Sequence, residues 1–179
     1  MPNLNQNNTE IHFEIASKEN VSLIKSWLKL EHVAKYFYGI GLENTIQDLE
    51  KFADSKKSLW THYLAYDQEI SFAYLMTSFI SPSDKPYSKY LEESTKAITL
   101  DLFIGDINYL GKGLAHSMIK QFLVQNFSFV TDVFIDPEKA NTKAIHVYEK
   151  TGFKKLETFV PTYNPVPHVL MQLKIQYLK

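Results

Sequence analysis

Two glycines stand close together at residues 108–115, between an apolar run and a segment with helical periodicity. Gly111 and Gly113 remove side chains where a backbone could approach a ligand, and the following helix would point its unpaired N–H groups and positive dipole end outward. A pyrophosphate group would fit there. On its own, however, a Gly-x-Gly pair favours a simpler interpretation, a tight turn between a strand and a helix.

Two other phosphate-binding motifs do not match this segment. A Walker A loop ends in Gly-Lys-Ser/Thr, whereas Lys112 is followed by Gly113, and Gly105 lies one residue too far upstream. A dinucleotide fingerprint has a third glycine three residues after the second, where this chain has His116. The sequence therefore supports neither a nucleotide hydrolase nor a dehydrogenase.

One acid, Asp101, interrupts the apolar run at residues 98–104, which leads into the glycine loop. A carboxylate in a buried strand could take a proton from a reacting group, or it could be a structural acid at a sheet bulge. The six histidines show no HExxH motif or other convincing ligand spacing, so we expect no metal.

The composition limits the partners. With 19 Lys and Arg residues against 20 Asp and Glu, the chain has no basic surplus for nucleic acid or an anionic membrane. The absence of Cys excludes disulfides, a thiolate nucleophile and a Cys-ligated metal.

No apolar stretch approaches the roughly 20 residues that span a bilayer, and residues 1–9 lack a signal-peptide pattern. We expect one soluble, cytoplasmic domain over residues 1–179, with a flexible N-terminus at residues 1–9.

Hydrophobic periodicity predicts the elements that would position these residues. Before residue 81 it predicts a strand at 11–15, helices at 19–30 and 45–53, and a hairpin of strands 59–66 and 70–80. The loop-rich segment 81–95 is expected to separate two halves of one sheet. After it come strands 97–104 and 133–135, helices 111–127 and 141–151, and a hairpin of strands 153–160 and 168–176. This order indicates a mixed sheet flanked by helices.

Two segments resemble motifs of the GNAT superfamily of N-acetyltransferases. Residues 108–113 resemble its acetyl-CoA pyrophosphate motif, Gln/Arg-x-x-Gly-x-Gly/Ala, with Asn108 where the family has Gln or Arg. Residues 141–153 resemble its Asn-x-x-Ala-Ile-x-x-Tyr-Glu-Lys-x-Gly-Phe helix. The resemblance implies an α/β (α+β) fold with a mixed, mostly antiparallel central sheet of about seven strands and about four flanking helices.

Within the superfamily, residues 26–172 are most similar to aminoglycoside 6'-N-acetyltransferases. The stretches that carry this likeness are Trp27, Leu28, His32, Val33, Tyr36 and Phe37, then Leu91, Glu92 and Glu93, then Leu100 and Asp101 ahead of residues 110–114. In those relatives the aromatic pair is typically two Trp, and the turn near Asn164 carries an acid.

The resemblance implies direct attack of an amine on acetyl-CoA in a ternary complex. Asp101 would take the amine's proton, directly or through water, because an ammonium with a pKa of about 10 cannot attack a thioester. Tyr148 would protonate the departing thiolate, and the backbone N–H of Leu102 or Phe103 would hold the developing oxyanion. The implied acetyl-CoA contacts are Leu102, Phe103, Ile104, Asn108, Tyr109, Leu110, Gly111, Lys112, Gly113, Leu114, Ala115, His116, Asn141, Ala144 and Tyr148.

A polycationic acceptor needs carboxylates beside flat aromatic faces. The implied substrate-binding residues are Tyr36, Phe37, Glu92, Glu93 and Asp101, although a solvated loop would explain Glu92 and Glu93 equally well. The predicted reaction is acetylation of the 6'-amine of an aminoglycoside, an antibiotic-resistance activity, by a monomer or a homodimer.

Two alternatives stay open. One is a polyamine, peptide N-terminal or hydroxylysine acyltransferase. The other is a non-catalytic acyl-CoA-binding sensor, which would keep the glycine loop but would have no use for Asp101 or Tyr148.

Overall fold

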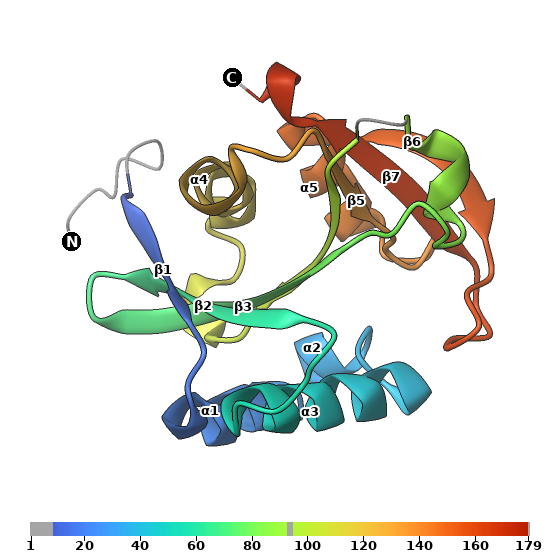
Figure 1. Ribbon diagram of the computed structural model, residues 1–179. Coiled ribbons are helices and arrows are strands. Elements are labelled where there is room, and N and C mark those ends of the chain that lie inside the picture. Colours follow the sequence, from blue (N-terminus) through green and yellow to red (C-terminus); the bar gives the residue numbers. More distant parts are fainter. Residues whose placement is uncertain (1–8, 93–94, 179) are drawn as a thin grey trace.

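A computed structural model describes residues 9–92 and 95–178. Within these residues seven strands form one sheet, in the order β1-β2-β3-β4-β5-β7-β6 (Figure 1). The strands are β1 (Ile11–Ile15), β2 (Thr61–Asp67), β3 (Ile70–Phe79), β4 (Ala97–Ile104), β5 (Asp132–Ile135), β6 (Lys154–Phe159) and β7 (His168–Lys174). Neighbouring strands are antiparallel except for β4 and β5. The predicted mixed, mostly antiparallel sheet is confirmed.

Helices cover both faces of the sheet. On one face lie α1 (Val21–Trp27), α2 (Glu31–Ala34) and α3 (Gly39–Ala53), and on the other lie α4 (Leu114–Phe127) and α5 (Thr142–Thr151) (Figure 1). Short 3-10 turns occupy Lys18–Asn20, Tyr87–Tyr90, Ile107–Tyr109 and Ile175–Tyr177. The described residues thus form five α-helices rather than about four, because α2 is a single turn with no periodicity to read. None of these helices has the length and apolar character that crossing a membrane requires.

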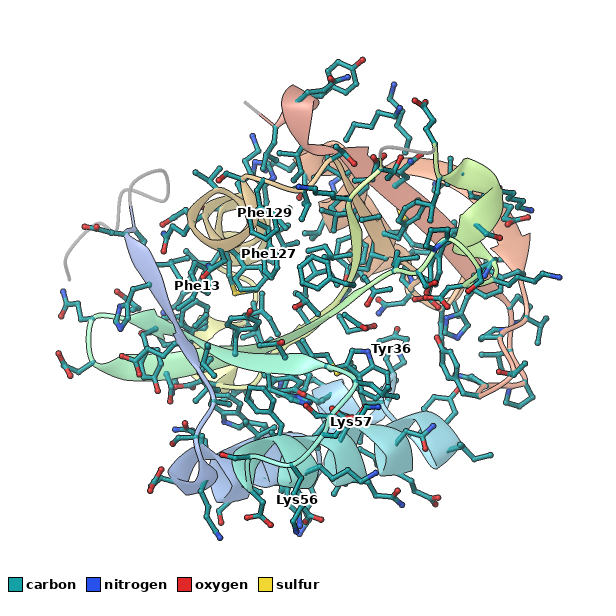
Figure 2. All side chains as sticks on the ribbon, in the orientation of Figure 1. Phe13, Tyr36, Lys56, Lys57, Phe127 and Phe129 are labelled. Atoms are coloured by element: carbon teal, nitrogen blue, oxygen red, sulfur yellow. The ribbon has the colours of Figure 1, made fainter. Side chains whose placement is uncertain are left out.

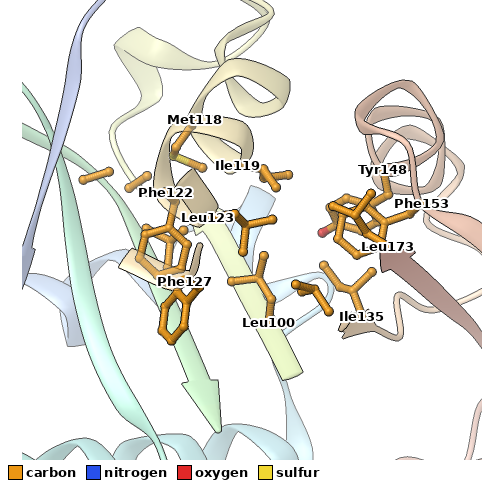
Figure 3. Packing of buried hydrophobic residues seen from close by; sticks show 14 of the residues in the cluster. Leu100, Met118, Ile119, Phe122, Leu123, Phe127, Ile135, Tyr148, Phe153 and Leu173 are labelled. Carbon is orange, nitrogen blue, oxygen red and sulfur yellow. The ribbon is translucent and has the colours of Figure 1, made fainter. Parts of the chain in front are cut away.

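Each helical layer encloses its own hydrophobic core. The larger core lies beneath α4 and α5 and contains Leu100, Met118 and Phe122, which are fully buried (Figure 3). The smaller one lies beneath α1 and α3 and contains Ile24 and Tyr74. The sheet is therefore covered by apolar contacts on both faces, and this holds its strand ends in place for a site.

The sheet divides at a different place from the one predicted. Segment 81–95 was expected to separate two halves, yet β3 and β4 on either side of it pair directly and without interruption, from Ala73↔Ile104 to Phe79↔Ile98. The division lies between β4 and β5 instead, because their parallel pairing covers only Ala97–Thr99 and then ends. The two strands separate at the position of Asp101.

Three predicted helices have different boundaries. The helix predicted at 19–30 is shorter, since α1 spans only Val21–Trp27 and a 3-10 turn precedes it. The helix predicted from residue 111 begins at Leu114, because Gly111 and Gly113 both adopt a φ of 71°, which a right-handed helix does not allow. The helix predicted from residue 45 begins at Gly39 and brings two further turns to the same side of the sheet as Asp101. The left-handed Gly152 ends α5 after Thr151, where the predicted helix 141–151 also ends.

Gly105 allows Trp27 to pack directly on the end of β4. A Cβ at residue 105 would lie 2.0 Å from Trp27 Cδ2, and Trp27 is only 6% exposed. Gly105→Ala is therefore expected to lower the free energy of unfolding by about 1–3 kcal/mol in urea denaturation, since the strand or the ring has to shift. The cost should fall when Trp27→Leu is also present. An unchanged cost in that background would show that the clash is not with Trp27.

Candidate active site

A cleft of about 420 Å³ lies between the α2–α3 layer and the C-terminal half of the sheet. Segments that are distant in the chain form its walls: α3 and the residues before it, the ends of β3 and β4, the segment after β5, α5 and the loop before β7. Figure 2 shows Tyr36 beside α2 and above α3, between the helical layer and the C-terminal half. A larger hollow of about 540 Å³ lies between α5 and β6, but neither Asp101 nor Tyr148 lines it. The chemistry predicted from the sequence therefore belongs to the smaller cleft.

The cleft brings Asp101 and Tyr148 together from opposite faces of the sheet. Asp101 lies on β4, on the same face as Phe103, which packs in the α1–α3 core. Tyr148 comes from α5 and packs beside Phe153 in the other core (Figure 3). Both line the cleft. Tyr148 can do so because β4 and β5 have already separated at that level.

The electrostatics of the two residues suit proton transfer. Burial, and then the charge of Asp136, raise the pKa of Asp101 to about 7, while His168 opposes the shift. A carboxyl with such a pKa can both accept and release a proton near neutral pH. Burial, with Asp101 and Asp136, raises the pKa of Tyr148 above its ordinary value, so its hydroxyl stays protonated and can act as a donor.

A second acid, Asp136, was missed by the sequence analysis. It follows β5 and lines the cleft with Asp101. The Tyr163 hydroxyl donates to Asp136 Oδ2 at 2.7 Å, and His168 Nδ1 lies 2.6 Å from the Asp136 carbonyl oxygen. Burial lowers the pKa of His168, but its hydrogen bonds to Asp136 outweigh this and raise the pKa overall. The available signal was an acid directly after a buried strand.

Further polar groups continue this wall. Asn164 Nδ2 donates to Glu138 Oε1 at 3.1 Å, and the Tyr38 hydroxyl lies 3.5 Å from Asn164 Oδ1. Among the described residues that line the cleft, four carry carboxyl groups and one is a lysine: Asp84, Asp101, Asp136 and Glu138, against Lys85. The cleft is acidic and suits a cationic ligand.

Both predicted aromatic residues line the cleft, whereas Glu92 of the predicted acidic pair does not. Tyr36 and Phe37 both line the cleft, and the Phe37 ring packs edge-on against Phe103 at 5.1 Å. Glu92 lies outside the lining. Its side chain is 82% exposed and faces Lys174 at 4.0 Å, as a solvated loop residue would. Glu93 falls outside the described residues.

The glycine loop has the shape of an anion cradle. At both Gly111 and Gly113 the space that a Cβ would occupy is empty to 4 Å. Gly113 is also the N-cap of α4, so no capping side chain accepts from the N–H groups of the first turn. Open space beside the two glycines, together with an uncapped helix start, fits a pyrophosphate.

Several residues around this loop have structural contacts. The Tyr109 ring stacks on Phe72 at 4.6 Å, and its hydroxyl donates to Asp67. Asn108 Nδ2 donates to Asp106 Oδ1 at 3.0 Å, within the turn before the loop. Three of the remaining predicted contacts make side-chain contacts: Lys112 lies 5.2 Å over the Tyr109 ring, His116 hydrogen-bonds Thr151, and Asn141 caps α5 by accepting from Ala144 N–H. Leu110 is exposed, Ala115 is partly buried and Leu114 is buried.

The register of β4 distinguishes between the two predicted oxyanion donors. Gly105 N–H donates to Phe72 O, and the Ala97 carbonyl accepts from Ile80 N–H, so the odd-numbered residues of β4 hydrogen-bond to β3. Phe103 belongs to this set. Leu102 and Ile104 have the opposite orientation, towards the side where the pairing with β5 has ended. Of the two candidates, Leu102 is therefore the one whose N–H faces the opening.

Within residues 9–92 and 95–178, no group of three or more His, Asp or Glu side chains is arranged to hold a metal ion.

Comparison with known proteins places this geometry in a family. The model of the acetyltransferase (GNAT) domain matches residues 16–160. The crystal structure of aminoglycoside N(6')acetyltransferase from Legionella pneumophila is 40% identical, covers 96% of this chain and 95% of its own, and superposes with a TM-score of 0.87. Two further structures share the fold. Aminoglycoside acetyltransferase AAC(6')-Ib with coenzyme A and kanamycin is 22% identical (93% and 96% covered, TM-score 0.74), and Vibrio cholerae spermidine N-acetyltransferase with CoA and spermine is 15% identical (94% and 98% covered, TM-score 0.69).

Proposed function

This chain belongs to the GNAT acetyltransferase family, and we propose that it transfers the acetyl group of acetyl-CoA to the 6'-amine of an aminoglycoside. Membership makes it an acetyl-CoA-dependent N-acetyltransferase. The acidic, aromatic cleft beside Asp101 is the observation that carries the choice of acceptor. The 40% identical Legionella protein, an aminoglycoside N(6')acetyltransferase that matches nearly end to end, supports the same acceptor. The family match over residues 16–160 supports one acetyltransferase domain.

The glycine loop and the opening between β4 and β5 would hold acetyl-CoA. Backbone N–H groups at Gly111, Gly113 and the start of α4 would bind the pyrophosphate, since no side chain caps α4 and the two glycines leave open space beside the backbone. Acetyl-CoA supplies the acetyl group as an activated thioester. Leu102 N–H would donate to the thioester oxygen as negative charge develops on it.

Asp101 and Tyr148 would move the protons. Asp101 takes a proton from the bound ammonium group, because only the free amine can attack the thioester carbon. Its raised pKa matches this task near neutral pH. Tyr148 holds its own proton and can donate it to the departing sulfur. Neither step requires a covalent acyl-enzyme.

The other walls would bind the remaining ammonium groups and the sugar rings. Asp136 and Glu138 offer carboxylates on one side, and Tyr36 and Phe37 offer flat faces on the other. Asp136 Oδ2 already accepts from Tyr163, which fixes the orientation of its carboxylate. An acceptor with several amines can therefore be oriented by more than one contact while Asp101 acts on one of them.

A panel of acceptors tests the proposal. In a thiol-release assay with acetyl-CoA, kanamycin and tobramycin are expected to turn over faster than spermidine or peptides, because only they offer both ammonium groups and rings to the cleft. Neomycin and paromomycin form a matched pair that differs only in an amine or a hydroxyl at the 6' position. Neomycin should react and paromomycin should not.

The alternatives would give other patterns. The spermidine N-acetyltransferase shares the fold of this chain, so a polyamine acceptor is one alternative. A polyamine acetyltransferase would turn over spermidine fastest. Equal acetylation of neomycin and paromomycin would reject the 6'-amine. Turnover of peptides alone would reject the whole acceptor class.

A further inference from the structure

Three polar side chains form a continuous chain of contacts inside the smaller core. His62 Nε2 lies 2.9 Å from Asp48 Oδ1, and His62 Nδ1 lies 2.6 Å from the Tyr74 hydroxyl. His62 and Tyr74 have no exposed surface, and Asp48 is 5% exposed. The three come from α3, β2 and β3, so this chain of contacts ties the helical layer to two strands of the sheet.

The positions of the protons follow from burial. Burial lowers the pKa of His62 although Asp48 opposes the shift, so the ring is neutral. Its Nε2–H then donates to Asp48, and its bare Nδ1 accepts from the Tyr74 hydroxyl. Each member depends on its neighbour, because a buried imidazole nitrogen without a partner costs free energy.

Asp48 also holds the segment between α3 and β2. Its Oδ2 accepts from Leu59 N–H at 2.7 Å, and its Oδ1 accepts from Trp60 N–H at 3.1 Å. Trp60 lines the cleft. One carboxylate therefore fixes both the helix that carries it and the backbone of a wall residue.

The same helix supplies one wall of the cleft, which together with Trp60 is called the α3–Trp60 wall. Tyr38 is the N-cap of α3, and Gly41 and Thr45 lie within its first two turns; all three line the cleft. Thr45 lies three residues before Asp48, so its side chain shares one face of the helix with Asp48. At the other end of the chain of contacts, the Tyr74 hydroxyl lies 3.5 Å from Sδ of Met76, which lines the cleft and is paired with Asp101 in the β3–β4 ladder.

We propose that Asp48, His62 and Tyr74 are positioning residues that set the distance of the α3–Trp60 wall from the sheet and thereby determine the affinity for the acceptor. The proposal rests on the proposed function, since it assumes that this cleft binds the acceptor. None of the three lines the cleft, so they act through the wall. Their effect should fall on acceptor binding, because the glycine loop lies at a different part of the sheet.

Tyr74→Phe removes one hydroxyl and leaves the ring. It is expected to raise the acceptor KM about threefold to tenfold, with kcat and the KM for acetyl-CoA within about twofold of wild type. The matched control is Tyr63→Phe, which removes a buried hydroxyl from the neighbouring strand on the opposite face, in the α4–α5 core. This control should leave both KM values unchanged.

A second readout does not depend on activity. Hydrogen exchange at the Leu59 and Trp60 amides, which donate to Asp48, should be faster in Tyr74→Phe than in Tyr63→Phe. Asp48→Asn should speed this exchange further, since an amide nitrogen cannot accept a hydrogen bond.

Unchanged exchange and unchanged acceptor KM in Tyr74→Phe would overturn the proposal. An equal rise in both KM values, or the same changes in the control, would overturn it too. If wild type fails to acetylate any aminoglycoside, the proposed function fails, while the exchange comparison still decides whether the wall is held in this way.

Discussion

Asp101→Asn is expected to lower kcat by about 100-fold or more while leaving acetyl-CoA affinity unchanged. The side chain keeps its shape but can no longer take a proton from the acceptor ammonium. Steady-state kinetics at saturating acetyl-CoA measure the effect. Tyr148→Phe is the comparison. Its kcat is expected to fall less, because a solvent proton can reach the departing sulfur in place of the phenol proton.

The pH dependence provides a check on this role. Because the pKa of Asp101 is raised to about 7, wild-type kcat/KM should fall as pH drops below that value, and Asp101→Asn should lose this limb of the profile. The free energy of unfolding should depend on pH in the opposite direction. A carboxyl whose folded pKa lies above its unfolded value of 3.8 costs stability as pH rises between the two, so the variant should be at least as stable as wild type above pH 7. A raised acceptor KM with kcat unchanged would instead make Asp101 a binding residue.

Gly111→Asp is expected to weaken acetyl-CoA binding by about 100-fold or more, because it places a negative charge beside the pyrophosphate. Gly111→Asn is the matched control. Asn has nearly the same shape, tolerates the φ of 71° at this position better than most residues, and carries no charge. Titration calorimetry with acetyl-CoA should show a modest loss for Asn and a severe one for Asp. Equal affinities for the two folded variants would remove the pyrophosphate from this loop.

Local pattern was sufficient for the elements that carry chemistry. The glycine loop, the buried strand with Asp101 and the helix with Tyr148 each have their signal within about a dozen residues, and β4 has the bounds predicted for it. Helix starts were less well placed. The left-handed glycines delay α4 to Leu114, and Gly39 and Gly41, which are poor helix formers, hid the start of α3. A backbone torsion at a glycine leaves no mark in hydrophobic periodicity.

Local pattern marks Asp136 as an acid after a buried strand, but it does not show which residues Asp136 meets. Asp136 and His168 are 32 residues apart, and their contact depends on the register of β5 against β7. Glu92 shows the converse. It stands in a stretch that resembles the substrate-facing part of a family, yet the fold turns it to solvent beside Lys174. Sequence position predicts neither outcome, since strand pairing decides which loop ends meet.

By itself the sequence determined which groups are available for chemistry: a glycine pair at the start of a helix, one acid before it and a tyrosine behind it, because each depends on residue type and short spacing. The tertiary structure alone decided where that chemistry meets. The pairing of β4 with β5 ends at Thr99, and that single change in the sheet admits Tyr148 from the far face and frees Leu102 N–H. It likewise assembled Asp48, His62 and Tyr74 from three elements. Such contacts arise from long-range register and packing, which no local pattern of residues records.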